Sequence, residues 1–451
     1  MNADDPKPVA NPLSGRFLFN INFVFASTMI GNTVGFGVAI LLARELGPDG
    51  RGVLTLYSAA VTLAFAFLNL GIGGGAFYFA ARREIAGRDA MEAALSISLL
   101  AAAVTAIGVV IARVVYGDEL AERHLPYALT IFAVPALIQL RALDAVLRAQ
   151  GRFGAVNAID LGLPLSMVAI VGGMALTVGL DVPKAVWGWT LSYVPALLLG
   201  YALIGRSQWP RALATVALLR RVVRFGAQGQ LTNLILLANS RLDSFLILIF
   251  VNTAGVGLYT VASSQTEGLW TIANSVSIVL LTNITSGDAD NAARMTPVVC
   301  RNTLLVTFLG AVGAAVIVSF WLPVVFGRAY SDSVLPYLWL LPGTVALSGS
   351  KILAAYVFSR GRPIVNAWIA LVTLAITIPT DIVLISLFGV AGAAAGTSLG
   401  YAISLALTAI VYRRQSGNSL LATLLPQRSD AGLYLDLARS GFARLRRRAA
   451  A

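Results

Sequence analysis

The chain has 451 residues, of which 57% are hydrophobic and 12% are charged, with a net charge of +12. A soluble domain usually carries about 25% charged residues, so this composition excludes an ordinary soluble protein. The single cysteine, Cys300, excludes an internal disulfide framework. We find no metal-binding spacing, phosphate-binding glycine loop, nucleophile elbow or paired catalytic carboxylates, and therefore expect no enzyme, no cofactor and no metal.

Apolar runs recur along the chain at lengths that suit a bilayer. A spanning helix needs about 20 apolar residues, and residues 93–112 form one such run. The connections are short, as in the Gly-Pro-Asp-Gly sequence at 47–50. In chain order, the predicted spans are 17–43, 53–80, 91–115, 125–147, 154–179, 184–205, 222–250, 256–284, 298–325, 334–358, 363–387 and 390–412. These runs predict an all-α polytopic membrane protein with about twelve transmembrane helices.

Basic residues predict the orientation of the chain. Of the 33 Lys and Arg, 25 fall in the two tails and the even-numbered loops, and 6 fall in the odd-numbered loops. The positive-inside rule then places both termini in the cytoplasm. The net charge therefore indicates a membrane surface rather than nucleic acid. A basic segment at 433–448 is either an amphipathic helix on that surface or a disordered tail.

The chain resembles itself at a shift of about 205–210 residues, by direct comparison of its segments. Residues 150–158 match 360–367, and residues 185–201 match 393–409. Two pseudo-symmetric six-helix bundles are predicted, although chance similarity among Leu-, Ala- and Gly-rich helices is an alternative. In transporters built this way the substrate site lies between the repeats. The expected division is 1–16 N-terminal cytoplasmic tail, 17–205 first bundle, 206–221 cytoplasmic linker, 222–412 second bundle and 413–451 basic cytoplasmic tail.

Polar side chains mark the surfaces of spanning helices that meet protein or water, because burying them against lipid is costly. The predicted helix at 256–284 carries a stripe on one face, and the helix at 222–250 carries polar residues as well. We expect these stripes to line a substrate cavity. The cavity candidates on the two helices are Gln230, Asn233, Arg241, Ser263, Glu267, Trp270 and Asn274.

Arg241 is the most informative residue of this set, because it lies about five turns into its helix. Exposing it to lipid would cost at least ~3 kcal/mol, so it should face water, a counter-ion or an anionic ligand. Glu267 is the expected partner, and a structural pair with Glu267 or Asp243 is the alternative. Lys351 is a weaker cavity candidate that could snorkel to the surface. Asp381 and Glu267 are candidates for ion coupling, although Asp381 could instead bond to a neighbouring helix.

Four segments resemble one family. The stretch ILLARELGPDGRGVLTLY at 40–57 and the segments 67–79, 239–262 and 361–367 resemble O-antigen-translocase-type polysaccharide flippases. These belong to the multidrug/oligosaccharidyl-lipid/polysaccharide (MOP) exporter superfamily. The resemblance extends to about residue 412, and its motifs are mostly architectural. It implies a MATE/MOP-like fold of two six-helix bundles with a cavity between them.

The resemblance also implies a function. It implies that a polyprenyl-pyrophosphate-linked oligosaccharide crosses a bacterial cytoplasmic (inner) membrane by alternating access, for surface polysaccharide such as the O-antigen of lipopolysaccharide. The expected partners are that lipid-linked oligosaccharide, membrane lipids and the polysaccharide polymerase machinery. Arg241 and Lys351 would be the cationic groups of the cavity, and a coupling cation, H⁺ or Na⁺, stays open.

The alternative function is an ion-coupled multidrug exporter of the same superfamily. Such exporters often rely on carboxylates embedded in the membrane, and the first predicted helix has none. A membrane glycosyltransferase would need long outward loops or catalytic carboxylates, and the outward loops predicted here are short.

Overall fold

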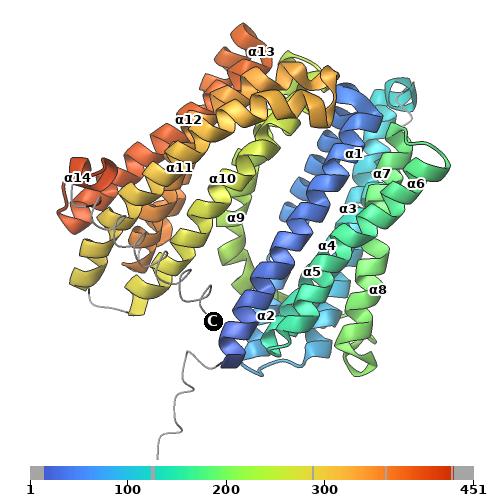
Figure 1. Ribbon diagram of the computed structural model, residues 1–451. Coiled ribbons are helices and arrows are strands. Elements are labelled where there is room, and N and C mark those ends of the chain that lie inside the picture. Colours follow the sequence, from blue (N-terminus) through green and yellow to red (C-terminus); the bar gives the residue numbers. More distant parts are fainter. Residues whose placement is uncertain (1–14, 123–126, 287–288, 361–362, 428–429, 431–451) are drawn as a thin grey trace, which may run out of the picture. The chain divides into compact units, whose positions relative to one another are not determined.

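The computed structural model describes residues 15–122, 127–286, 289–360, 363–427 and 430 (Figure 1). Only the backbone is described for 15–29 and 116–122 and for several positions within 228–240 and 278–292. Every regular element in these residues is a helix. Most of the predicted N-terminal tail and the predicted surface segment at 433–448 lie outside the described residues.

Contacts divide the chain into two compact units, Met1–Leu237 and Ala238–Ala451, which we describe separately. The first contains α1 (Gly15–Leu68), α2 (Ile72–Ala81), α3 (Gly87–Glu122), η1 (Tyr127–Leu129), α4 (Thr130–Ala149), α5 (Phe153–Met167), η2 (Val168–Gly172), α6 (Gly173–Thr177), α7 (Val182–Leu191), α8 (Tyr193–Ile204), η3 (Arg206–Gln208) and the first part of α9 (Val216–Phe250). The second contains the rest of α9, α10 (Thr253–Ser286), α11 (Ala289–Phe326), η4 (Arg328–Ser333), α12 (Val334–Ser359), α13 (Pro363–Ser416) and α14 (Leu420–Leu424).

The predicted spans coincide with these helices. α1 and α13 each hold two predicted spans, because the chain bends inside them at Gly47 (φ 65°) and Gly389 (φ 58°). Glycine adopts positive φ without the steric cost that a Cβ imposes. In the described part of the chain, eight helical stretches are long and apolar enough to cross a membrane. The prediction of an all-α polytopic membrane protein is therefore confirmed.

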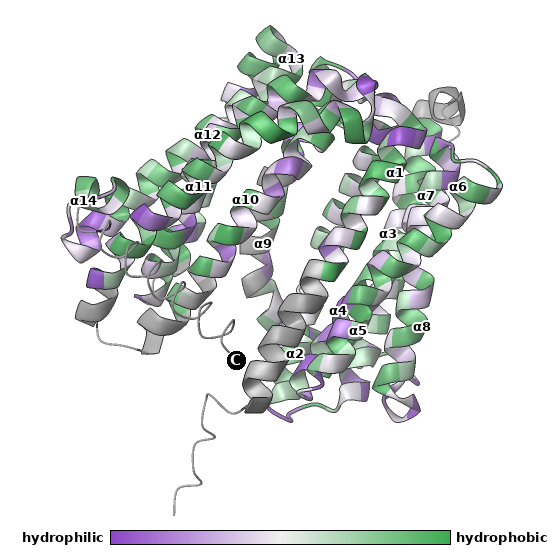
Figure 2. Cartoon of the chain, viewed as in Figure 1, coloured by the Kyte–Doolittle hydropathy of each residue, from purple (hydrophilic) through white to green (hydrophobic). Residues whose placement is uncertain are grey.

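One detail differs from the prediction. The span predicted at 53–80 is interrupted, because α1 ends at Leu68 and α2 begins at Ile72. Figure 2 shows hydrophilic residues along α10, whereas α11 to α13 are mostly hydrophobic. The polar residues of the predicted stripe therefore lie on α10.

The first turns of α9 cross α2 at very short range. A Cβ atom added at Gly71 would lie 2.3 Å from the backbone of Gly226, and one at Gly75 would lie 2.4 Å from the carbonyl oxygen of Val222. Small residues at such crossings allow helix backbones to approach closely. The boundary between the units consequently falls inside α9, later in the chain than the linker predicted at 206–221.

The two units share one packing feature. In the first unit, the hydroxyl of Tyr57 on α1 lies 3.1 Å from that of Thr190 on α7. In the second, the hydroxyl of Tyr259 on α10 lies 2.8 Å from that of Thr397 on α13. Each unit thus joins its second predicted span to its last one through a Tyr–Thr hydrogen bond, which suits pseudo-symmetric bundles.

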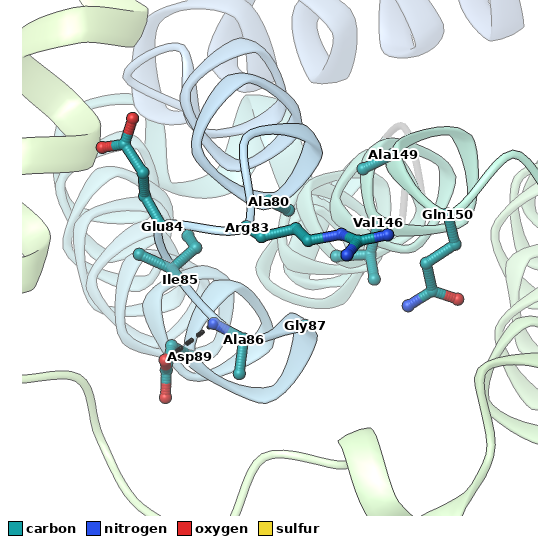
Figure 3. Close-up of a pocket in the computed structure, with 10 residues that line it drawn as sticks. All are labelled: Ala80, Arg83, Glu84, Ile85, Ala86, Gly87, Asp89, Val146, Ala149 and Gln150. Atoms are coloured by element: carbon teal, nitrogen blue, oxygen red, sulfur yellow. Dashed lines mark hydrogen bonds between the residues drawn. The ribbon is translucent and has the colours of Figure 1, made fainter. Parts of the chain in front are cut away.

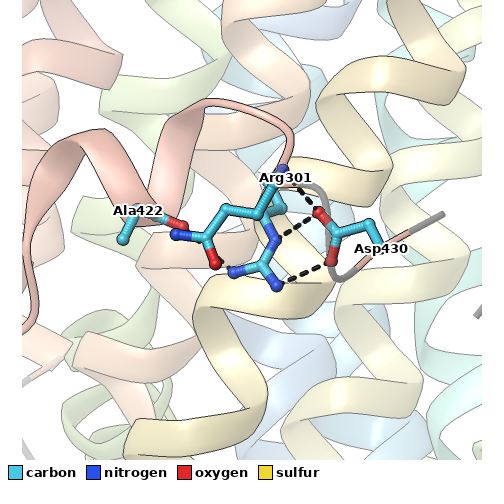
Figure 4. Close-up of polar contacts among 4 residues, drawn as sticks. Arg301, Ala422 and Asp430 are labelled. Atoms are coloured by element: carbon cyan, nitrogen blue, oxygen red, sulfur yellow. Dashed lines mark hydrogen bonds and ion pairs between the residues drawn. The ribbon is translucent and has the colours of Figure 1, made fainter. Parts of the chain in front are cut away.

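A buried ion pair fastens the segment after α13 to α11 (Figure 4). Arg301 donates two hydrogen bonds of 2.6 Å to the carboxylate of Asp430 and one of 3.1 Å to the carbonyl oxygen of Ala422. Both charged side chains are less than a tenth exposed. The hydrogen bonds from Arg301 hold the pKa of Asp430 below its ordinary value of 3.8. The ion pair therefore stabilises the fold at neutral pH and is lost as the pH falls through that lowered pKa.

We expect Asp430→Asn to lower the free energy of unfolding by about 3 kcal/mol, because Arg301 would stay buried without its counter-charge. Thermal unfolding of the purified protein, followed by tryptophan fluorescence, measures this change. Asp332→Asn, an exposed carboxylate of the same unit, is the control. The difference between Asp430→Asn and wild type should shrink below about pH 4, since protonation removes the same charge in the wild type. Equal melting temperatures for both variants at pH 7 would contradict this role.

Candidate functional site

Three of the predicted cavity residues come together between α10 and α12. The ammonium of Lys351 on α12 donates a 2.5 Å hydrogen bond to the side-chain oxygen of Asn274 on α10. The same ammonium lies 4.5 Å from the centre of the Trp270 ring, within the range of a cation–π contact. A further bond from Ser277 to the backbone oxygen of Lys351 fixes the two helices at this level. We call Lys351, Asn274 and Trp270 the cationic cluster.

Two of the predicted cavity residues hold a side-chain nitrogen donor that is buried without a described partner. The Nε atom of Arg241 on α9 and the indole nitrogen of Trp270 on α10 are both inaccessible, and neither has a hydrogen-bond acceptor in the described part of the chain. A buried donor left unpaired costs about 1–3 kcal/mol, so natural proteins seldom leave one without a reason. Both donors belong to residues that the sequence assigned to the cavity.

The expected partners of Arg241 are placed differently. Among the described side chains, no direct ion pair joins Arg241 to Glu267 or to Asp243. Glu267 is exposed on α10, one turn before Trp270. Asp243 is buried and instead accepts hydrogen bonds from the hydroxyls of Tyr259, at 2.7 Å, and Thr397, at 2.9 Å. Arg241 and Glu267 therefore do not neutralise each other by direct contact.

Other predicted cavity residues lie apart from the cationic cluster. Gln230 belongs to the first unit, where its amide donates a 2.7 Å hydrogen bond to the carbonyl oxygen of Ala66. That carbonyl lies in the last turn of α1, where the break before α2 frees carbonyl groups that lipid cannot satisfy. Ser263 donates to the carbonyl oxygen of Thr260 on its own helix, at 3.2 Å. The side chain of Asn233 lies outside the described residues.

Asp381, the candidate for ion coupling, is buried on α13 about two turns before the bend at Gly389. Its side chain is 2% exposed, and its Oδ1 atom has no hydrogen-bond partner in the described residues. The hydroxyls of Thr377 and Thr373, one and two turns earlier, are also buried without a described partner. Asp381, Thr377 and Thr373 therefore form the predicted stripe. The alternative role of Asp381 was a hydrogen bond to a neighbouring helix, and its Oδ1 atom makes no such bond within the described residues.

Sequence reasoning did not assign Asp243 to the same place as Asp381. Asp381 faces Gly396, since a Cβ atom there would lie 1.8 Å from its Oδ1. Asp243 is bonded to Thr397, the next residue on the same helix. The two buried carboxylates therefore reach adjacent residues of α13. No spacing in the sequence links Asp243 on α9 to Asp381 on α13, so only the packing of the helices shows that both approach the same part of α13. We call Asp243 and Asp381 the carboxylate pair.

Comparisons with known proteins place the chain in a family. A family model described as "Polysaccharide biosynthesis protein" matches residues 17–282. The chain belongs to this family. A "Probable low-salt glycan biosynthesis flippase Agl15" of Haloferax volcanii is 22% identical over 400 residues, with coverage of 84% of this chain and 81% of the relative. The resemblance to polysaccharide flippases that the sequence suggested is confirmed.

Solved structures show the same fold. One is an inward-facing "multidrug resistance MATE family transporter of the MOP superfamily", with a TM-score of 0.67, 14% identity, and coverage of 87% of this chain and 98% of that chain. Another is "Lipid II flippase MurJ, inward closed conformation", with a TM-score of 0.68, 15% identity, and coverage of 87% of both chains. The chain is therefore a multi-pass membrane protein with the fold of these MOP-superfamily transporters. Its relatives are transporters, in agreement with a transporter rather than an enzyme.

We expect Gly396→Ala to disrupt the carboxylate pair, because the new methyl group would overlap the buried carboxylate of Asp381. Overpacking of this kind costs about 1–3 kcal/mol, and thermal unfolding measures it. Gly313→Ala on α11 is the matched control, since a Cβ atom there meets open space. A melting temperature for Gly396→Ala at or above that of the control would show that the described packing around Asp381 is wrong.

Proposed function

We propose that this family member is a flippase that carries a polyprenyl-pyrophosphate-linked oligosaccharide across a cytoplasmic membrane, for surface polysaccharide biosynthesis, by alternating access. The similarity to a probable glycan biosynthesis flippase supports a lipid-linked glycan as the cargo.

The observation that carries the proposal is the cationic cluster together with the unpaired donor of Arg241. A pyrophosphate is a compact anion, and guanidinium and ammonium groups are the side chains that bind phosphate oxygens most strongly. Lys351 holds a positive charge against Trp270, and Arg241 has a free Nε–H in the same unit. An anionic head group would supply the acceptors that these buried donors lack.

The same residues suit the sugar part of the cargo. The face of an indole ring packs against the apolar face of a sugar, and the buried indole nitrogen of Trp270 can donate to a hydroxyl. Asn274 is exposed on α10 next to Lys351 and offers its amide nitrogen, because its oxygen is already bonded to the lysine. Weak, adaptable contacts of this kind suit cargo that must be released on the other side.

Asp381 and Asp243 suit the coupling of transport to a cation. A buried carboxylate is costly to keep charged without a partner, so a proton or Na⁺ would stabilise the carboxylate pair. The hydroxyls of Thr377 and Thr397 are oxygen ligands of the type that hard cations prefer. Binding or release of the cation would change the packing of α13 against α9 and α10. Glu267 stays an alternative coupling carboxylate, since it lies exposed on α10.

We expect Arg241→Ala and Lys351→Met each to reduce export of the lipid-linked glycan at least about tenfold, because each removes a charge-assisted contact to the pyrophosphate. Complementation of a strain that lacks its surface-polysaccharide flippase measures export, and membrane content is checked by immunoblot. Lys184→Met, which changes a lysine in the first turn of α7 in the first unit, is the control. Normal export from both variants would overturn the assignment of the site.

The same strains separate the alternative function. An ion-coupled multidrug exporter should raise drug tolerance in a sensitised strain without complementing the polysaccharide defect. Drug tolerance that depends on Asp381 but not on Lys351, with no complementation, would replace the flippase proposal.

We expect Asp381→Asn to abolish the dependence of transport on the coupling cation while leaving glycan binding within about threefold of wild type, since Asp381 lies outside the cationic cluster. Proteoliposomes with an imposed proton or sodium gradient measure the dependence. Asp332→Asn is again the control. Gradient-stimulated transport by Asp381→Asn equal to that of the wild type would exclude Asp381 and favour Glu267.

A further inference from the structure

The first turns of α9 carry a basic groove in the first unit. A cavity of about 530 Å³ is lined by Ala217, Arg220, Arg221, Arg224 and Phe225. All five residues are exposed and lie on one face of the helix, whereas Val222 on the opposite face is completely buried. The first turns of α9 are therefore amphipathic, with one face packed against its own unit and the other face presenting three arginines.

One of these arginines is fixed in place. Arg221 forms an ion pair with Glu84, which also holds Arg82 at 3.0 Å. The guanidinium of Arg221 lies 4.5 Å from the centre of the Phe79 ring. In Figure 3, Glu84 points away from Arg83, which extends across a separate 420 Å³ cavity toward Gln150. The carboxylate of Glu84 therefore pairs with Arg82 and Arg221. The 420 Å³ cavity is separate from the basic groove.

The other two arginines have no such partner. Arg220 and Arg224 make no hydrogen bond or ion pair within the described residues, and they lie one helical turn apart on the same face. Two guanidiniums at this spacing repel each other slightly. Their arrangement therefore gives the groove an unsatisfied positive charge next to the fixed Arg221.

The place of the groove along the chain selects its ligand. Arg224 and Phe225 stand where the predicted span at 222–250 begins, on the side that the distribution of basic residues assigns to the cytoplasm. The ring of Phe225 is stacked on that of Tyr78, with centres 4.0 Å apart. Aromatic rings gather at the head-group level of a bilayer, and arginine binds phosphate through two parallel hydrogen bonds. The groove thus combines phosphate-binding groups with an apolar wall at the depth of lipid phosphates.

We propose that Arg220, Arg221 and Arg224 form a binding site for a lipid-borne phosphate at the cytoplasmic end of the first unit. The phosphate belongs to an anionic phospholipid or to a polyprenyl pyrophosphate, which share the chemistry recognised by the groove. The site is distinct from the cationic cluster, which lies on α10 and α12 of the second unit. The proposal concerns binding alone and does not depend on the proposed transport.

Native mass spectrometry of the purified, delipidated full chain tests the site. The variant is Arg220→Gln/Arg224→Gln, and the matched control is Arg206→Gln/Arg211→Gln, which removes the same charge from exposed positions ahead of α9. The probes are dioleoyl phosphatidylglycerol, undecaprenyl pyrophosphate and inorganic pyrophosphate. Both variants change exposed side chains, so their melting temperatures should match that of the wild type.

We expect the variant, but not the control, to bind at least one of the two lipids about tenfold more weakly, because charge-assisted hydrogen bonds are lost. A loss for phosphatidylglycerol alone identifies a membrane phospholipid as the ligand, and a loss for undecaprenyl pyrophosphate alone identifies the polyprenyl carrier. Unchanged binding of both lipids, an equal loss in the control, or a loss confined to inorganic pyrophosphate would overturn the proposal.

Discussion

Within a bilayer no water is available to bind a polar group, so each amide, hydroxyl and charge in a spanning helix needs a partner in the protein or in a ligand. Gln230 and Asn69 show how the chain meets this constraint at the break between α1 and α2. The amide of Gln230 reaches Ala66, and the amide of Asn69 returns to Phe65 at 3.0 Å. The carboxylate of Asp243 accepts hydrogen bonds from the hydroxyls of Tyr259 and Thr397. The polar groups of Gln230, Asn69 and Asp243 are therefore satisfied within the protein.

Several buried polar atoms lack a described partner, and three of them belong to functional candidates. Arg241, Trp270 and Asp381 each keep a buried polar atom without a described partner. All three belong to the second unit. A protein that moves a polar head group through hydrocarbon must offer it contacts that are unsatisfied when the cargo is absent. The cationic cluster and the carboxylate pair are separate groups of residues, which would allow the cargo and the coupling cation to bind at different sites.

Small residues allow the helices to come close enough for these contacts. Gly71 and Gly226 bring the backbones of the α1–α2 turn and α9 together, and Gly396 leaves room for the carboxylate of Asp381. Helix association in lipid gains little from the hydrophobic effect, so close packing and hydrogen bonds dominate. The glycines therefore determine where polar groups from distant segments meet.

The sequence alone determined that the chain spans a membrane, where its helices run, and which of them are polar, because apolar run length and turn residues are local properties. It also singled out Arg241, Lys351 and Asp381, since a charge inside an apolar run is visible without any fold. Only the tertiary structure decided which of these residues have partners. Lys351 meets Asn274 and Trp270, Gln230 turns to a backbone carbonyl, and Asp243 approaches the same turn of α13 as Asp381. The reason is physical: helical periodicity fixes the face on which a side chain stands, but the neighbour it meets depends on how separate helices pack.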